Sequence, residues 1–253
     1  MLDIVIATRD NVNWLLRLIK RIQDFTSVPY QIYLQDTSLS HHVHDEFANQ
    51  TSYQKLNFEG LSRTWNEGIK RGNYPYVCIL NDDCLVGRHW TTILEVLNQQ
   101  DDIYLITPVE HLYLNMNRFE CFSGINNVTP ENFDDHENIV YERNKGIFKP
   151  LQITQYREVT KGNDPPDTLP VTGACFFFRR KVLDEIGYLD EQFRLFYEDI
   201  DFFLRINYKY RIAVSAYNII YHHRNFTISQ VTNARSEMEE SCVKFCTKWG
   251  PIP

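Results

Sequence analysis

Three short segments of the sequence concentrate side chains that could hold a metal ion or accept a proton. Asn81–Asp83 places an amide and two carboxylates directly after the apolar run YVCIL at 76–80. The segment FYEDIDFFLR at 196–205 clusters acids, and YHHRN at 221–225 contains a pair of histidines. Carboxylate oxygens and imidazole nitrogens are common ligands of divalent cations, and a carboxylate can also act as a general base. The sequence therefore indicates metal-assisted or acid–base chemistry.

Polar residues follow three candidate strands, which end in Thr8–Asp10, Asp36–Ser38 and Asn81–Asp83. Ligands of open parallel sheets bind at the carboxyl ends of the strands, so we expect a nucleotide to lie across these three ends. Phosphates repel carboxylates unless a divalent cation bridges them. The acids at 81–83 therefore predict a Mg²⁺ or Mn²⁺ ion that holds a diphosphate. The alternative, a solvated turn, is less favoured because the other two strand ends are polar as well.

The acids at 196–205 have two interpretations. Glu198, Asp199 and Asp201 fall at the expected start of a helix, where the helix dipole stabilises anions. The functional alternative is a general base that takes a proton from a hydroxyl nucleophile. The histidine pair at 222–223 is similarly either a source of a nitrogen ligand or structural.

Apolar periodicity predicts the elements that must position these segments. Strands are expected at 2–8, 30–36, 76–80 and 103–107, and helices from Trp14 to Ile22, at 61–72 and at 90–97. Strands that alternate with helices are typical of an α/β domain with a largely parallel sheet.

The second half is less regular, because residues 110–170 follow no clear period and receive no assignment. Beyond them we expect a strand in GACFFFRR, a helix closed by Gly187, a helix in 197–210, and two short strands, RIAVSA and NIIYHH. A C-terminal helix at 231–249 would carry an apolar face made of Met238, Cys242, Phe245 and Trp249. That face must be covered by the chain's own core, another subunit or a membrane surface. A single domain, 1–253, is the simplest organisation, with a first part at 1–108, a second at 109–230, and the helix at 231–253.

Composition excludes several classes of protein. The formal charge of −7 does not attract nucleic acid, and no apolar run is long enough to span a bilayer. The N-terminus MLDIVIATRD lacks the basic start of a signal peptide. Six cysteines without a CxxC pair are typical of reduced core residues, so we expect a cytoplasmic protein.

Together these segments resemble one enzyme family. The chain presents, in order, an apolar first strand, an Asp after the second, NEG, LNDD, TGACFFFRR, GYLDEQFRLFYEDIDFFLR and YHH. This order resembles the family 2 inverting glycosyltransferases of GT-A fold, especially the rhamnosyltransferase-like enzymes of surface-polysaccharide biosynthesis. The resemblance covers 2–98 and 170–224 and is most specific from Thr172 to Arg205.

The resemblance implies a role for each matching residue. Asp199 would be the catalytic base, and Asp83 and His222 would ligate a Mn²⁺ or Mg²⁺ cofactor. Contacts with the donor nucleotide or its sugar are implied for Thr8, Asp36, Arg63, Asn66, Asn81, Asp82, Gly173 and Ala174. Two departures stand out: Asn81 replaces the first acid of the DxD-type motif, and Arg9-Asp10 replaces an aromatic-Asn pair.

The implied reaction transfers a sugar, with inversion, from a UDP-, dTDP- or GDP-linked donor to a hydroxyl of a glycan or glycolipid acceptor. Residues 110–170 would take part in acceptor recognition, and peripheral membrane contact stays open. A non-catalytic nucleotide-sugar or glycan-binding module is one alternative. A sugar nucleotidyltransferase is another, disfavoured because ATRDNVNW has no glycine to form a loop around a triphosphate.

Overall fold

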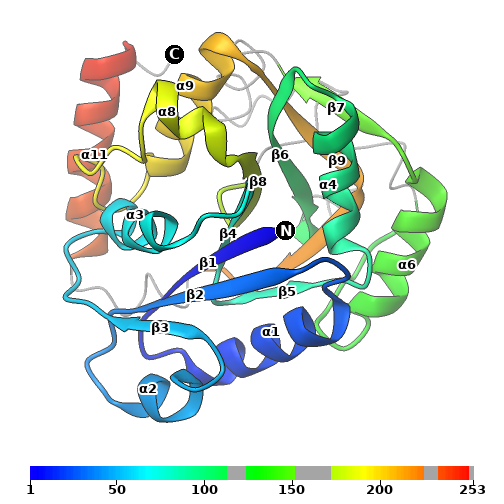
Figure 1. The fold of residues 1–253 in the computed structure, drawn as a ribbon, viewed down its shortest axis with the longest axis horizontal. Helices are drawn as coiled ribbons and strands as arrows, with labels where there is room; N and C mark the ends of the chain where they lie inside the picture. Colours follow the sequence, from blue (N-terminus) through cyan, green and yellow to red (C-terminus); the bar gives the residue numbers. More distant parts are fainter. Residues whose placement is uncertain (113–123, 152–171, 225–232, 251–253) are drawn as a thin grey trace.

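A computed structural model of the chain describes residues 1–112, 124–151, 172–224 and 233–250. In this part of the chain, helices flank a central mixed sheet (Figure 1). The strand order is β3-β2-β1-β4-β8-β6-β9-β5, and β7 pairs with β9 beside this path. The predicted α/β fold class is therefore confirmed.

The first half alternates strands with helices. Its elements are β1 (Leu2–Thr8), α1 (Val12–Phe25), β2 (Tyr30–Asp36), α2 (His42–Phe47), β3 (Ser52–Lys55), α3 (Leu61–Arg71) and β4 (Tyr76–Asn81). β1 pairs in parallel with both β2 and β4, and β2 pairs in parallel with β3. The sequence predicted all of these elements except α2 and β3, which are too short for a clear period.

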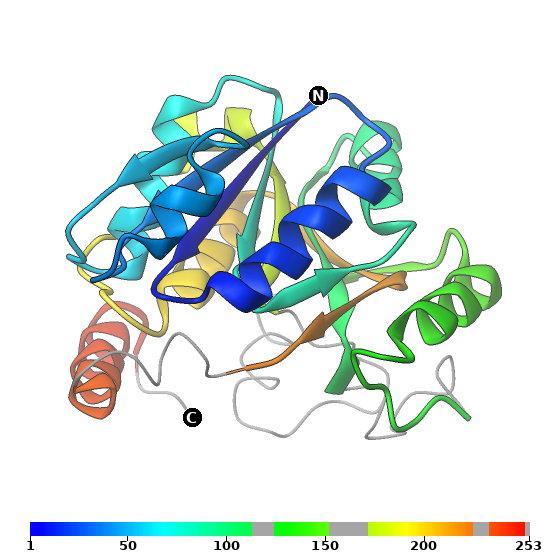
Figure 2. The same ribbon diagram turned by 90° about the horizontal axis from the view of Figure 1, so that it is seen from below.

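Strand register brings the three polar strand ends to one edge. Thr8 lies opposite Asp36 on β2, and Ala7 lies opposite Asn81 on β4. Successive side chains of β1 point to opposite faces of the sheet and therefore pack into two different hydrophobic cores. Ile4 and Ile6 belong to the core that includes α1, whereas Val5 belongs to the core that includes α3 and α9. The sheet thus lies between two helical layers (Figure 2).

The second half adds antiparallel pairings. Its elements are β5 (Cys84–Val86), the 3₁₀ turn η1 (Trp90–Thr92), α4 (Ile93–Gln99), β6 (Ile103–Glu110), α6 (Phe133–Asn144), β7 (Phe148–Leu151), β8 (Cys175–Arg179), the 3₁₀ turn η3 (Arg180–Val182), α8 (Leu183–Ile186), α9 (Glu198–Lys209), β9 (Arg211–His222) and α11 (Ala234–Trp249). β8 inserts between β4 and β6 and runs antiparallel to both. β5 leaves β4 at the Asp82–Asp83 turn and pairs antiparallel with β9, which places Cys84 opposite His222.

The prediction of two short strands in RIAVSA and NIIYHH is wrong, because β9 is continuous from Arg211 to His222. Its register against β6 shifts between Thr107 and Val109, so a bulge absorbs the intervening residues. Within the bulge, Asn218 Nδ2 donates to the carbonyl of His89 at 2.8 Å, and Asn218 Oδ1 accepts from Ser215 Oγ at 2.7 Å. These hydrogen bonds satisfy the polar residues that interrupt the apolar pattern.

The segment 110–170, which the sequence left unassigned, contributes α6 and β7; its residues 113–123 and 152–170 lie outside the described part. The C-terminal helix is confirmed as α11. Phe245 is buried on it, whereas Met238 is 41% exposed, so only part of the expected apolar face is covered. No helix in the described part combines the length and apolarity needed to cross a membrane.

Candidate active site

A cavity of about 410 Å³ opens where the three polar strand ends meet β8 and the start of α9. Its volume is in the range of small-molecule sites. Most of the residues that the sequence singled out contribute to its wall: Thr8, Asn81, Asp82, Asp83, Gly173, Ala174, Asp199 and His222.

The ends of β1 and β4 are joined by a buried hydrogen bond. Thr8 Oγ1 donates to Asp82 Oδ2 at 2.7 Å, and both residues are almost fully buried. On the other side of β4, the Asn81 N–H donates to the carbonyl of Ala174 at 2.9 Å. The Asn81–Asp83 turn is therefore held from both sides, which fixes the direction of its carboxylates.

One end of the cavity is built from Arg9, Thr37 and Phe58. Arg9 Nη1 donates to the Thr37 carbonyl at 3.1 Å, and its guanidinium lies 5.4 Å from the centre of the Phe58 ring. Arg9, which departs from the expected aromatic residue, thus orders this end together with an aromatic side chain from another segment. A planar base would find a flat, partly apolar surface here.

Asp36 does not line the cavity. Its Oδ2 accepts from the Tyr53 hydroxyl at 2.6 Å and from Lys55 Nζ at 3.0 Å, and its Oδ1 accepts from the Ser38 N–H at 2.8 Å. The side chain is fully buried. Asp36 thus organises the strand end, and its neighbour Thr37 reaches the cavity instead.

Arg63 and Asn66 also lie outside the cavity wall. Arg63 is half exposed and pairs with Glu59. Asn66 donates to the Leu189 carbonyl at 2.9 Å and accepts from the Leu189 N–H at 3.1 Å, so its amide fastens α3 to the loop before α9. Helix α3 instead presents three other side chains to the cavity: Leu61, Thr64 and Trp65.

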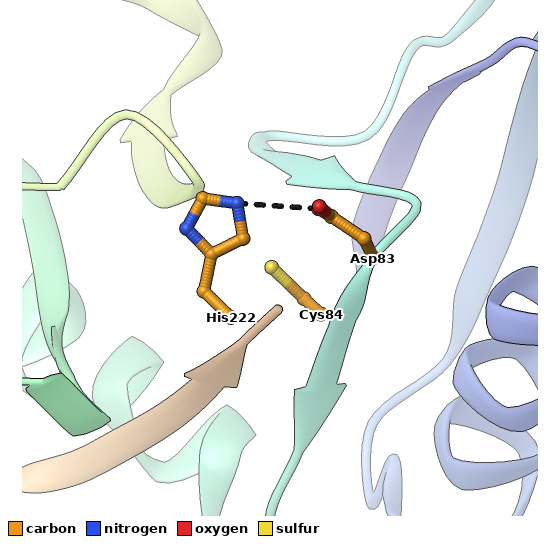
Figure 3. A group of neighbouring side chains, drawn as sticks. All are labelled: Asp83, Cys84 and His222. Carbon is orange, nitrogen blue, oxygen red and sulfur yellow. Dashed lines mark ion pairs between the residues drawn. The ribbon is translucent and has the colours of Figure 1, made fainter. Parts of the chain in front are cut away.

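Asp83, Cys84 and His222 bring potential metal-ligand atoms within 4.8 Å of one another (Figure 3). Asp83 Oδ1 lies 3.2 Å from His222 Nε2. Cys84 is a poor ligand, since burial and then the nearby Asp83 charge raise its pKa well above the usual value. Its thiol donates to the Ala174 carbonyl at 3.6 Å. One carboxylate and one imidazole remain, a set that suits Mn²⁺ or Mg²⁺ once phosphate and water oxygens complete the shell.

Glu110 holds His222 from the other side. Its Oε1 lies 3.1 Å from His222 Nδ1 and accepts from Arg224 Nε, while its Oε2 accepts from Thr172 Oγ1 at 3.2 Å. Burial opposes ionisation of Glu110, but hydrogen bonds and charge from His222 and Arg224 outweigh it and lower its pKa to about 2. For His222, burial acts to lower the pKa, but the hydrogen bonds that the ring donates to Asp83 and Glu110, together with their charges, raise it to about 9. His222 is thereby oriented with Nε2 toward Asp83.

Asp199 sits in the first turn of α9 and is partly exposed to the cavity. Burial raises its pKa, although the Ile200 N–H, which donates to Oδ1 at 2.8 Å, opposes the shift. Glu198 is buried, and burial together with the Asp199 charge raises its pKa well above the ordinary value. Among the described residues, its Oε2 finds no hydrogen-bond partner. Burial disfavours ionisation of both carboxyls, and the charge of Asp199 further disfavours ionisation of Glu198, so the pair favours a single ionised carboxylate.

Gly173 leaves the room that Asp199 occupies. A Cβ at position 173 would lie 1.8 Å from Asp199 Oδ2, closer than any real contact. The adjacent Ala174 N–H donates to Thr172 Oγ1 at 3.1 Å, which shapes the turn. The absence of a side chain at Gly173 therefore allows the Asp199 carboxylate to lie against this turn in the cavity wall.

Sequence reasoning missed several residues of the cavity wall, among them Glu110, Thr172 and Arg224. Glu110 carried a usable signal, because it is the polar residue that ends β6. The prediction stopped that strand at residue 107, before Pro108. Thr172 and Arg224 lie within the segments TGACFFFRR and YHHRN, but the sequence analysis gave them no role of their own.

Comparisons with known proteins were made for both sequence and structure. A family model described as "Glycosyl transferase family 2" matches residues 3–187. A search of curated proteins finds no significant match. Among solved structures, S. aureus TarS 1–349 aligns at 13% identity with a TM-score of 0.57, over 87% of this chain and 60% of that one. The same protein "in complex with UDP-GlcNAc" aligns at 12% identity and a TM-score of 0.57, over 97% and 66%.

GalNAc-T7 "with UDP, GalNAc and Mn2+" aligns at 14% identity with a TM-score of 0.57, over 88% of this chain and 43% of that one. The chain thus spans about 60% of the first TarS structure and less than half of GalNAc-T7. At these identities the likeness concerns the fold.

Proposed function

The chain belongs to glycosyl transferase family 2 and has the GT-A fold, and on that premise we propose that it is a metal-dependent inverting glycosyltransferase. It would move a sugar from a nucleotide-sugar donor to a hydroxyl of a saccharide or other glycan acceptor. The observation that carries the proposal is one cavity that holds both a candidate base, Asp199, and a candidate cation site, Asp83 with His222.

Donor binding follows from the strand ends. Thr8, Asp82 and the Arg9–Thr37–Phe58 end would receive the nucleoside, and Asp83 and His222 would hold a Mn²⁺ or Mg²⁺ ion. Such an ion, when bound, neutralises charge on the departing diphosphate. The UDP and UDP-GlcNAc complexes of the structural neighbour TarS favour a UDP-linked donor over dTDP- or GDP-linked ones.

Asp199 supplies the proton acceptor. The acceptor hydroxyl would lose its proton to Asp199 as its oxygen forms a bond to the anomeric carbon. The bond between that carbon and the diphosphate breaks, and its electron pair leaves with the nucleoside diphosphate. A single displacement inverts the configuration at the anomeric carbon and requires one base. The Asp199–Glu198 pair, which favours one ionised carboxylate, would supply it. Residues 110–170 remain the proposed acceptor region, and a cytoplasmic location with a role in polysaccharide biosynthesis remains a prediction.

A donor panel tests the proposal against its two alternatives. We expect the protein with Mn²⁺ to release free nucleoside diphosphate from at least one UDP-, dTDP- or GDP-sugar, measured by chromatography. A nucleotidyltransferase would instead form nucleoside triphosphate when supplied with pyrophosphate. A binding module would bind the donor in calorimetry and release nothing. Either of these two outcomes would overturn the proposal.

A further inference from the structure

We propose that the C-terminal helix α11 is a clasp that positions the catalytic base, so that Trp249 and Lys248 are positioning residues for Asp199. The inference rests on the proposed function and extends it to a helix beyond the segment that the family model matches. Helix α11 packs beside the loop that precedes α9 and beside α9 itself (Figure 1). It lies outside the cavity wall and would act through that loop and through α9.

Helix α11 contacts the loop before α9. Lys248 Nζ pairs with Asp190 Oδ2 at 2.7 Å, and Lys244 Nζ donates to the Gln192 carbonyl at 3.1 Å. The ring of Phe245 lies 6.3 Å from that of Phe193, which is fully buried. These contacts fix the chain just before Leu195 and Phe196, both of which line the cavity.

Helix α11 also contacts α9 at Asp201, two residues beyond the proposed base. Trp249 Nε1 donates to Asp201 Oδ1 at 2.9 Å, and Lys248 Nζ lies 2.7 Å from the same oxygen. Asp201 is fully buried, and its other oxygen accepts from Arg205 Nε at 2.8 Å. A buried carboxylate requires such partners, because losing them leaves an uncompensated charge. Through Asp201, helix α11 thus restrains the first turn of α9.

Backbone geometry explains why this turn needs support. Phe196 and Tyr197 have φ values of 65° and 66°, the left-handed region that residues with a Cβ seldom adopt. Such conformations persist where surrounding contacts over-determine them, and they cluster at functional sites. The Phe245 ring packs 5.0 Å from that of Tyr197, so α11 covers the strained turn that leads directly into Glu198 and Asp199.

The test combines Trp249→Phe with Lys248→Met, which removes both α11 partners of Asp201 and leaves Arg205 in place. We expect roughly a 10-fold lower kcat with an unchanged KM for the donor, because a displaced base impairs the chemical step and not donor binding. Lys248→Arg alone, which keeps the cation, should retain most of the activity. Val243→Ala, on the exposed side of the same helix, is the matched control. Hydrogen exchange of the backbone amides at 195–201 should accelerate in the double variant only.

The exchange measurement does not depend on catalysis, so it distinguishes the two proposals. Faster exchange at 195–201 in a protein that processes no sugar donor would support the clasp and contradict the proposed function. Unchanged exchange at 195–201, or a kcat equal to wild type below the melting temperature, would overturn the clasp even if transfer occurs. A loss of melting temperature alone would assign α11 a purely structural role.

Discussion

Replacing Asp199 with Asn is expected to lower kcat by about 10²–10⁴-fold, the usual contribution of a general base. Asn keeps the size of the side chain and can still accept from the Ile200 N–H, but it cannot take the proton of the acceptor hydroxyl. Donor affinity should change little, because the proposed cation ligands Asp83 and His222 are intact. Steady-state kinetics and calorimetry with a nucleoside diphosphate measure the two effects separately.

Glu198→Gln is the matched control for this variant. Because burial and the Asp199 charge both raise the pKa of Glu198 and so disfavour its charged form, a neutral amide of the same shape should preserve turnover. The raised pKa of Asp199 also sets the pH dependence: the base is lost as pH falls through that pKa, so activity should decline on the acidic side. Near-normal turnover in Asp199→Asn, or a larger loss in Glu198→Gln, would contradict the assignment.

Replacing Asp83 with Ala should abolish most of the metal-dependent binding of a nucleoside diphosphate. Without a cation, the acids at 82, 83 and 110 would repel the diphosphate, so wild-type binding should also weaken in excess chelator. Loss of an outer-shell partner of a metal site typically costs about 10–100-fold in affinity, and loss of a direct ligand should cost at least as much. Titration calorimetry with UDP, with and without Mn²⁺, measures the effect.

Cys84→Ala is the control for Asp83→Ala. The Cys84 thiol is fully buried and stays protonated, so its loss should affect packing and melting temperature while leaving the Mn²⁺-dependent affinity in place. Equal UDP affinity in chelator and in Mn²⁺ would show that the acids at 81–83 do not hold a cation.

Local pattern was sufficient to predict the strand ends and the helix that carries Asp199. The apolar runs of β1, β2 and β4 are long enough to identify, and parallel pairing then aligns their ends, as the Thr8–Asp36 register shows. The acids in the first turn of α9 were likewise visible in the sequence, because the helical period of the following residues marks where the helix begins.

Long-range pairing was beyond the reach of local pattern. Asp83 meets His222 only because β5 crosses to pair with β9, and three residues of strand give little signal of that partner. Asp36 and Asn66 face away from the cavity because Tyr53 and Leu189, which belong to other segments, bind them. Strand β9 continues through its bulge, where Asn218 is hydrogen-bonded to Ser215 and to His89 of a distant segment, a pairing that local pattern does not reveal.

The anomeric configuration of the released sugar tests the central claim most directly. Proton NMR can follow the protein with Mn²⁺ and an α-linked nucleotide sugar that it turns over, with water as the acceptor if no other is known. Single displacement predicts that the β anomer appears first, before mutarotation, and that Asp199→Asn slows its appearance. Initial appearance of the α anomer would contradict the account, because retention requires a different arrangement of catalytic groups.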